Sequence, residues 1–176
     1  MKILVVGGSK GIGKAAVELL LEQGNEVIVA ARSNNDIRHL PIEFLEVDVT
    51  QDVSALEDLD DLNGLLFCPG SINLRPFKGL KPETFQADFE LNVLGAVKAL
   101  QAVGKNLGAS GQASVVFYST VAVQTGMPFH ASVAAAKGAL EGLTRSLAAE
   151  WAPKIRVNAI APGVILPGDQ RTTDYL

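Results

Sequence analysis

Cysteine and histidine are scarce in this sequence. Of its 176 residues, one is Cys and two are His. A single Cys excludes an intrachain disulfide scaffold and a Cys-rich metal site, and two His disfavour a His-based metal site. We therefore expect no bound metal.

Charge of either sign is also limited. Charged residues make up 19% of the chain, and the net charge is -4. This balance argues against a nucleic-acid binder that works through bulk positive charge. The hydrophobic share of 48% excludes a disordered chain. The length predicts one domain, residues 1–176, with a sizeable core.

No long hydrophobic run is present at the N-terminus. Residues 1–6 are mostly apolar, and Gly7 ends the run. The run is too short for a signal peptide or a membrane span. We therefore expect no membrane partner and a cytoplasmic, reducing location.

Short β-branched runs alternate with longer helical patterns along the chain. We expect strands at residues 2–6, 26–30, 44–47, 64–68, 113–119 and 155–160, and long helices at about 82–103 and 129–151. This repetition predicts an α/β fold with a doubly wound parallel sheet, Rossmann-like, in three α/β/α layers. The expected strand order is 3-2-1-4-5-6.

A glycine-rich loop joins the first strand to the first helix. Glycine permits a tight turn and lets backbone N–H groups approach a pyrophosphate at the helix N-terminus. The alternative is a glycine-rich turn with no ligand. The expected binding residues are Gly7, Ser9, Lys10, Gly11, Ile12 and Gly13.

The end of the second strand predicts which dinucleotide binds. An acidic residue there would bind the ribose 2′-hydroxyl of NAD. The sequence has Arg32 instead, and Lys10 lies in the glycine loop. Two cations suit a 2′-phosphate, so we expect NADP(H) in preference to NAD(H). The alternative is that both are ordinary solvated cations.

Together these motifs resemble the short-chain dehydrogenase/reductase family. The resemblance also covers Asn92, Lys137 and the segment 156–163. It implies an oxidoreductase that transfers hydride between the cofactor and a small carbonyl or alcohol. The cofactor contacts that it adds are Asp48, Val49, Gly70, Lys137, Pro162, Gly163 and Ile165.

The resemblance also assigns catalytic roles. It places Thr120 at the family's substrate-binding Ser, Lys137 at its Lys and Asn92 at its relay Asn. The family's proton-donating Tyr lies four residues before the Lys, and Val133 stands there.

Another group must therefore donate the proton if the chemistry is intact. His130, which we include among the catalytic candidates, Tyr118 and a water held by Lys137 are open alternatives. The chain could instead be a cofactor-binding pseudoenzyme, a sensor or partner protein without hydride transfer. A purely structural protein is a third possibility, which the glycine loop disfavours.

The C-terminal part departs from the family as well. Eleven residues follow Ile165, and residues 168–176 show no periodicity. The expectation is a domain without the family's substrate lobe and seventh strand. The resemblance further implies a homodimer or homotetramer formed through the helices 82–103 and 129–151.

Overall fold

Six parallel strands form one sheet at the centre of the fold. The computed structural model describes residues 1–109 and 111–165. The strand order is β3-β2-β1-β4-β5-β6, which confirms the predicted order. The strands are β1 (Lys2–Val6), β2 (Glu26–Ala31), β3 (Glu43–Glu46), β4 (Gly64–Phe67), β5 (Ala113–Tyr118) and β6 (Ile155–Ile160).

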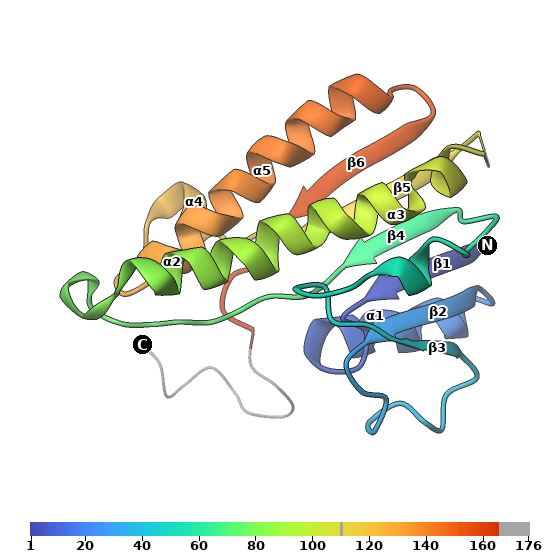
Figure 1. Cartoon of the computed structure of the whole chain (residues 1–176), viewed down its shortest axis with the longest axis horizontal. Helices are drawn as coiled ribbons and strands as arrows, with labels where there is room; N and C mark the ends of the chain where they lie inside the picture. Colours follow the sequence, from blue (N-terminus) through green and yellow to red (C-terminus); the bar gives the residue numbers. More distant parts are fainter. Residues whose placement is uncertain (110, 166–176) are drawn as a thin grey trace.

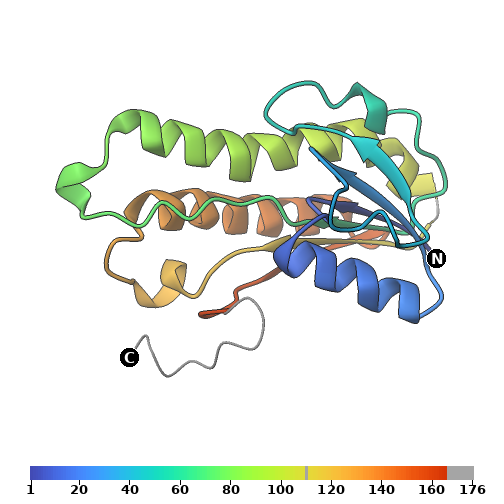
Figure 2. The ribbon, with the colours of Figure 1, turned by 90° about the horizontal axis from the view of Figure 1, so that it is seen from below.

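Helices cover both faces of this sheet (Figures 1 and 2). Helices α3 and α5 pack on one face and α1 lies on the other, whereas α2 packs against α5 (Figure 2). The helices are α1 (Gly11–Glu22), α2 (Pro82–Phe89), α3 (Gly95–Ala109), α4 (Ala122–Thr125) and α5 (Ala131–Trp151), with short turns η1 (Ser54–Leu56), η2 (Phe77–Gly79) and η3 (Glu90–Leu94). The Rossmann-like fold is thereby confirmed.

Strand β1 shows why the sheet needs cover on both sides. Its residues point alternately to the two faces, and nearly all of them are apolar. Leu4 and Val6 belong to the cluster beneath α3 and α5, whereas Ile3 and Val5 belong to the cluster beneath α1. In the first cluster the rings of Phe67 and Phe117 meet edge to face, with centroids 6.3 Å apart.

The helix expected at 82–103 is interrupted and is longer than expected. It consists of α2, the π-helical turn η3 and α3, and it continues to Ala109. The N–H of Gly95 donates to the carbonyl of Glu90, five residues earlier. Apolar spacing alone does not reveal such a one-residue bulge, because the residues on both sides of it remain amphipathic.

The helix expected at 129–151 begins two residues later than expected. Phe129 has φ +69°, and His130 has φ -98° and ψ 12°, so neither residue is helical. Strand boundaries shift by a single residue: β2 extends to Ala31, β3 covers Glu43–Glu46, and β4 and β5 end at Phe67 and Tyr118. The expectation for residues 168–176 lies outside the described residues.

Among the helices of the described residues, none is both long and apolar enough to cross a bilayer.

The buried aromatic pair should carry a large share of the stability. Phe117 is 0% exposed, so Phe117→Ala would leave a cavity and lower the free energy of unfolding by about 3–5 kcal/mol. The matched control Phe77→Ala removes a ring that is 74% exposed and should cost less than about 1 kcal/mol. Urea unfolding measures both changes. Equal losses in the two variants would contradict this account of the core.

Candidate functional site

The carboxyl ends of the strands form the edge at which the predicted site residues gather. Strand β1 lies between β2 and β4 in the sheet, and the chain winds outward in both directions from there. In open α/β sheets ligands bind at this point, beyond the carboxyl ends of the strands. The glycine loop after β1 and the Cys68–Pro69–Gly70 turn after β4 both lie at this edge.

The glycine loop is closed by contacts that exclude side chains. Gly7 has φ +75°, and its N–H donates to the carbonyl of Ala30 at 2.8 Å. A Cβ on Gly13 would lie 2.3 Å from the Gly7 carbonyl oxygen, so only glycine allows α1 to begin this close to the loop. Lys10 precedes α1 without a side-chain cap, which leaves backbone N–H groups of the first turn available to an anion.

The two predicted cations lie near this loop and are both exposed. The Lys10 ammonium is 3.8 Å from a carboxylate oxygen of Asp36, and the two side chains are 75% and 51% exposed. The sequence analysis did not anticipate this ion pair. Arg32 follows β2 directly, and its charge helps to lower the pKa of Asp48.

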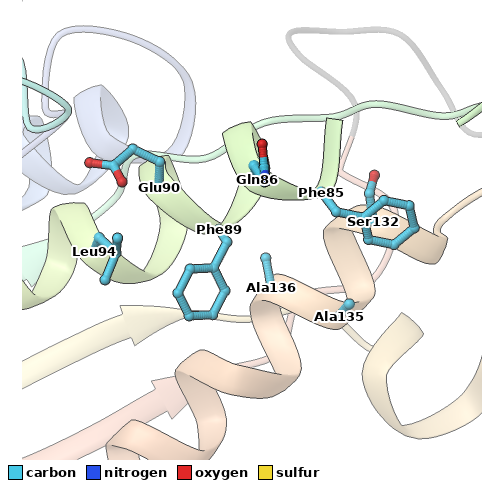
Figure 3. A pocket seen from close by; sticks show the side chains of 8 residues that line it. All are labelled: Phe85, Gln86, Phe89, Glu90, Leu94, Ser132, Ala135 and Ala136. Carbon is cyan, nitrogen blue, oxygen red and sulfur yellow. The ribbon is translucent and has the colours of Figure 1, made fainter. Parts of the chain in front are cut away.

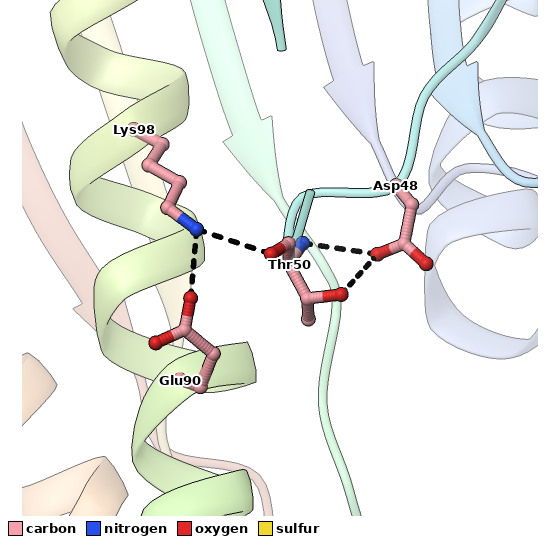
Figure 4. A network of polar contacts seen from close by, with 4 residues as sticks. All are labelled: Asp48, Thr50, Glu90 and Lys98. Carbon is pink, nitrogen blue, oxygen red and sulfur yellow. Dashed lines mark hydrogen bonds and ion pairs between the residues drawn. The ribbon is translucent and has the colours of Figure 1, made fainter. Parts of the chain in front are cut away.

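Asp48 is part of a polar network that links β3 to α3 (Figure 4). One of its oxygens accepts hydrogen bonds from the N–H and the hydroxyl of Thr50, at 2.9 and 2.7 Å. These two bonds are the main reason why the pKa of Asp48 lies below its ordinary value. Lys98 donates to the Thr50 carbonyl at 3.2 Å and to Glu90 at 2.7 Å. Asp48 is thus held in its charged form after β3, within electrostatic range of Arg32 and Lys98.

Val49, next to Asp48, packs closely against Gly95 at the start of α3. A Cβ on Gly95 would lie 2.8 Å from a methyl group of Val49, so the start of α3 can pack here only with glycine. Val49 is 5% exposed and belongs to the hydrophobic core.

Lys137 and Asn92 meet beside Gly70. A Cβ on Gly70 would lie 3.5 Å from both the Lys137 Nζ and the Asn92 Oδ1. Asn92 is 0% exposed and Lys137 is 7% exposed. Asn92 Oδ1 is buried and receives no hydrogen bond from the described residues. The sequence placed both residues in the site, and the structure brings them together.

Burial of Lys137 changes its titration. Desolvation lowers the pKa of Lys137 from 10.5 to about 8, and Cys68 opposes this shift weakly. Burial also raises the pKa of the Cys68 thiol to about 12, so Cys68 is a neutral thiol. The pKa of Tyr118 is raised, first by burial and then by Cys68.

Thr120 and Ser119 face different neighbours at the end of β5. The Thr120 hydroxyl accepts a hydrogen bond of 3.3 Å from the Ala122 N–H, at the start of α4. The Ser119 hydroxyl donates to Glu141 of α5 at 2.6 Å. Of these two adjacent hydroxyls, only that of Thr120 keeps its O–H free to donate to a substrate, because it donates no hydrogen bond within the described residues.

His130 and Val133 lie at the N-terminal end of α5. Nδ1 of His130 is 2.7 Å from the Pro128 carbonyl oxygen, so the ring turns toward its own loop. Val133 is 6% exposed and lies one turn before Lys137. The described contacts do not bring the His130 ring to Lys137.

The segment after β6 approaches the same edge. The carbonyl of Pro162 accepts a hydrogen bond of 3.1 Å from the Val121 N–H, which ties this segment to the start of α4. Gly163 and Ile165 are exposed.

Three polar residues near Asn92, of which Asp88 is buried and the other two are partly buried, were not predicted from the sequence. Asp88, Ser71 and Asn73 are linked by short side-chain hydrogen bonds. The spacing of four between Asp88 and Asn92 on a helix was the one available signal, because it places both on one face.

An open groove of about 580 Å³ lies between α2 and α5, and none of the predicted site residues lines it (Figure 3). Its lining is mostly apolar: Phe85, Gln86, Phe89, Glu90, Leu94, Ser132, Ala135 and Ala136. Within the described ranges, no three His, Cys, Asp or Glu side chains gather closely enough to hold a metal ion.

The lowered pKa of Lys137 predicts a pH-dependent stability. The unfolded chain holds this proton up to pH 10.5 and the folded chain only to about 8, so stability rises with pH in between. From pH 8 to 9 the native chain should gain about 1 kcal/mol relative to Lys137→Met. Urea unfolding at each pH measures this difference, and a constant difference would contradict the burial of a titrating ammonium.

The comparisons with known proteins agree with this geometry. The family model for short chain dehydrogenases matches residues 1–174. L-xylulose reductase of Homo sapiens is 32% identical over 175 residues, which cover 94% of this chain and 72% of that protein.

Solved structures show the same fold. A short-chain dehydrogenase from Streptomyces avermitilis superposes with a TM-score of 0.89 at 26% identity, covering 95% of this chain and 67% of that one. ElxO, solved with NADP bound, gives a TM-score of 0.85 at 26% identity, covering 94% of this chain and 74% of its own. The sheet order, the glycine loop and these matches show that the chain belongs to the short-chain dehydrogenase family.

Proposed function

We propose that this chain binds NADP(H) and acts as an oxidoreductase on a small carbonyl or alcohol, with a proton donor other than tyrosine. Its relatives include L-xylulose reductase, and the structural neighbour ElxO holds NADP. The observation that carries the proposal is Lys137, which is 7% exposed and whose ammonium lies beside Gly70, near Asn92, without a described acceptor. A buried cation needs a polar partner, and the hydroxyls of a nicotinamide ribose would supply one.

The residues at the sheet edge fit a dinucleotide. The glycine loop, in which a Cβ on Gly13 would collide with Gly7, leaves backbone N–H groups close to where a pyrophosphate would lie. The bound nicotinamide would supply the hydride acceptor or donor. The proposed cofactor contacts are Gly7, Ser9, Lys10, Gly11, Ile12, Gly13, Arg32, Asp48, Val49, Gly70, Lys137, Pro162, Gly163 and Ile165.

The preference for NADP(H) rests on two cations and on a missing carboxylate. Arg32 follows β2 directly, where an acidic residue would favour NAD. ElxO, a structural neighbour, holds NADP. The ion pair between Lys10 and Asp36 has the opposite effect, because Asp36 competes with a 2′-phosphate for the Lys10 ammonium.

The proton donor is a separate part of the proposal. Thr120 would hold the substrate oxygen, and Lys137 and Asn92 would order a water. His130 stays a candidate donor, although its ring is hydrogen bonded to its own loop. Tyr118 and a water on Lys137 are the other two. With the pKa of Lys137 near 8, its ammonium can supply a proton near neutral pH.

Association through the helices is part of the proposal as well. The groove between α2 and α5 exposes Phe89 (41%) and Leu94 (38%) within a mostly apolar lining, and contiguous apolar surface of this kind often marks a protein–protein contact. A second copy of the chain would cover it, giving a homodimer or homotetramer through 82–103 and 129–151.

Calorimetric titration with NADPH and NADH tests the cofactor assignment. We expect micromolar or tighter binding of NADPH and much weaker binding of NADH. Lys10→Met and Arg32→Met should each weaken NADPH binding about ten-fold or more and leave NADH unchanged. Asp36→Asn should tighten NADPH binding by about two- to five-fold, because it frees Lys10.

Asp58→Asn is the matched control, because it also removes one exposed acid. Asp58 lies two residues from Asp60, which pairs with Lys2 at the start of β1, the end of the strand opposite the glycine loop. Equal affinities for NADPH and NADH would refute the preference. Binding of neither would refute the cofactor assignment.

Restoring a tyrosine tests the chemistry. Val133→Tyr should raise the NADPH-dependent reduction of aldehydes and ketones by at most about 10²–10⁴-fold, the usual contribution of a positioned general acid, and by less the better the native donor is placed. Val133→Phe is the control, because it adds the same ring without the hydroxyl. If both variants and the native chain are inactive while NADPH binds, the chain is a cofactor-binding pseudoenzyme. If Val133→Phe gains as much, the effect is not proton donation.

A further inference from the structure

Asp88 is a buried acid that the proposed chemistry does not use. It lies in the last turn of α2 and is 1% exposed. Its Oδ1 accepts two hydrogen bonds, from the Ser71 hydroxyl at 2.5 Å and from the Asn73 amide at 2.6 Å. Its Oδ2 has no partner among the described residues. Burying a carboxyl without a cation costs stability, so a role that its hydrogen bonds serve is expected.

The same hydrogen bonds reach Asn92. The Asn92 amide donates to the Ser71 hydroxyl at 3.1 Å and to the main-chain carbonyl of Asp88 at 2.8 Å. Both of its N–H bonds therefore point toward Asp88 and Ser71. Its Oδ1 consequently points the other way, to the place beside Gly70 where the Lys137 ammonium also lies. Ser71 is the link, because it donates to Asp88 and accepts from Asn92.

Asp88 also holds the segment that follows Gly70. Ser71 and Asn73 turn inward to the Asp88 carboxyl, whereas Ile72 and Leu74 are 82% and 48% exposed. The Arg75 N–H then donates to the carbonyl of Phe129 at 3.2 Å, just before α5. The segment 71–75 thus runs extended from Gly70 to the start of α5, with alternate side chains inward and outward.

We propose that Asp88 is a positioning residue of this active site: its carboxyl holds the segment 71–75 and, through Ser71, orients the Asn92 amide beside Lys137. Held in this way, the segment keeps Ile72 and Leu74 on its outer, exposed side. This inference rests on the proposed function for its meaning, but its hydrogen bonds can be tested without substrate or cofactor.

The hydrogen bonds of the Asp88 carboxyl predict which substitutions at this position keep the arrangement. Ser71 and Asn73 both offer donors, so one acceptor oxygen at the Oδ1 position satisfies both. Asp88→Asn keeps that oxygen and places its amide nitrogen where Oδ2 has no described partner. Asp88→Leu keeps the approximate size and removes every acceptor. Asn should therefore substitute for Asp88, and Leu should not.

The side-chain amide of Asn92 reports on the arrangement in ¹⁵N–¹H spectra of the full chain. Asn92→Asp identifies its pair of signals by their loss. We expect Asp88→Leu and Ser71→Ala to speed deuterium exchange of this amide by about ten-fold or more. Asp88→Asn should change it by less than about three-fold. The control Glu90→Gln weakens the 2.7 Å bond to Lys98 in the adjacent turn and should leave the Asn92 exchange unchanged.

Thermolysin reports on the segment 71–75, because it cleaves on the amino side of Ile72 and Leu74. Native chain, Asp88→Asn and Glu90→Gln should resist cleavage there, and Asp88→Leu and Asn73→Ala should be cut at least about ten-fold faster. Unfolding midpoints measured alongside separate local release from loss of the whole fold. Should Asp88→Leu not fold, Ser71→Ala and Asn73→Ala carry the test.

The proposal is overturned if folded Asp88→Leu, or both Ser71→Ala and Asn73→Ala, keep native exchange and cleavage rates. It is also overturned if Asp88→Asn behaves like Asp88→Leu, since the role would then not be hydrogen-bond acceptance. Calorimetry with NADPH on the same variants separates a failure of the proposed function from a failure of the Asp88 proposal. A native chain that binds no NADPH refutes the proposed function and leaves the exchange and cleavage results standing as a test of the Asp88 contacts.

Discussion

The parallel register of β1, β4 and β5 is the constraint on which the rest of this site depends. Val6 pairs with Phe67, and Phe67 pairs with Phe117. Because the three strands are aligned at these residues, their carboxyl ends lie side by side in the sheet. The glycine loop, the Gly70 turn and the two hydroxyls after β5 therefore lie along one edge. A slip of two residues in any of these strands would separate them while leaving the apolar faces matched.

Much of the fold was predictable because its signals are local and repeated. Apolar runs of four to six residues indicated the strands, and the glycine loop after the first run indicated a Rossmann-like fold, whose usual strand order the sheet has. Lys137 and Asn92 were placed in the site through motif resemblance, and their distance to Gly70 agrees with it. Boundaries were less accurate, since conformations such as that of Phe129, at φ +69°, follow from loop contacts that no spacing encodes.

The interactions that the sequence did not reveal are polar contacts between distant segments. Asp88 meets Ser71 and Asn73 across 17 and 15 residues of chain. Lys10 meets Asp36 although helix α1 and strand β2 lie between them in the chain. Such pairs depend on where the backbone returns, and a polar side chain in a loop has the same appearance whether it is solvated or buried. The sheet register had to be known before these contacts could be found.

The π-helical turn at η3 separates two surfaces of one long helix. A turn with one extra residue rotates everything before it by about 100° relative to an uninterrupted α-helix. The face of α3 that meets the sheet, through Ala96 and Val103, is fixed by the core. The facing of α2 is set independently, by the bulge. Insertion or loss of a single residue here would therefore turn Asp88 away from Ser71 and Asn73, while Ala96 and Val103 of α3 keep their contacts with the sheet.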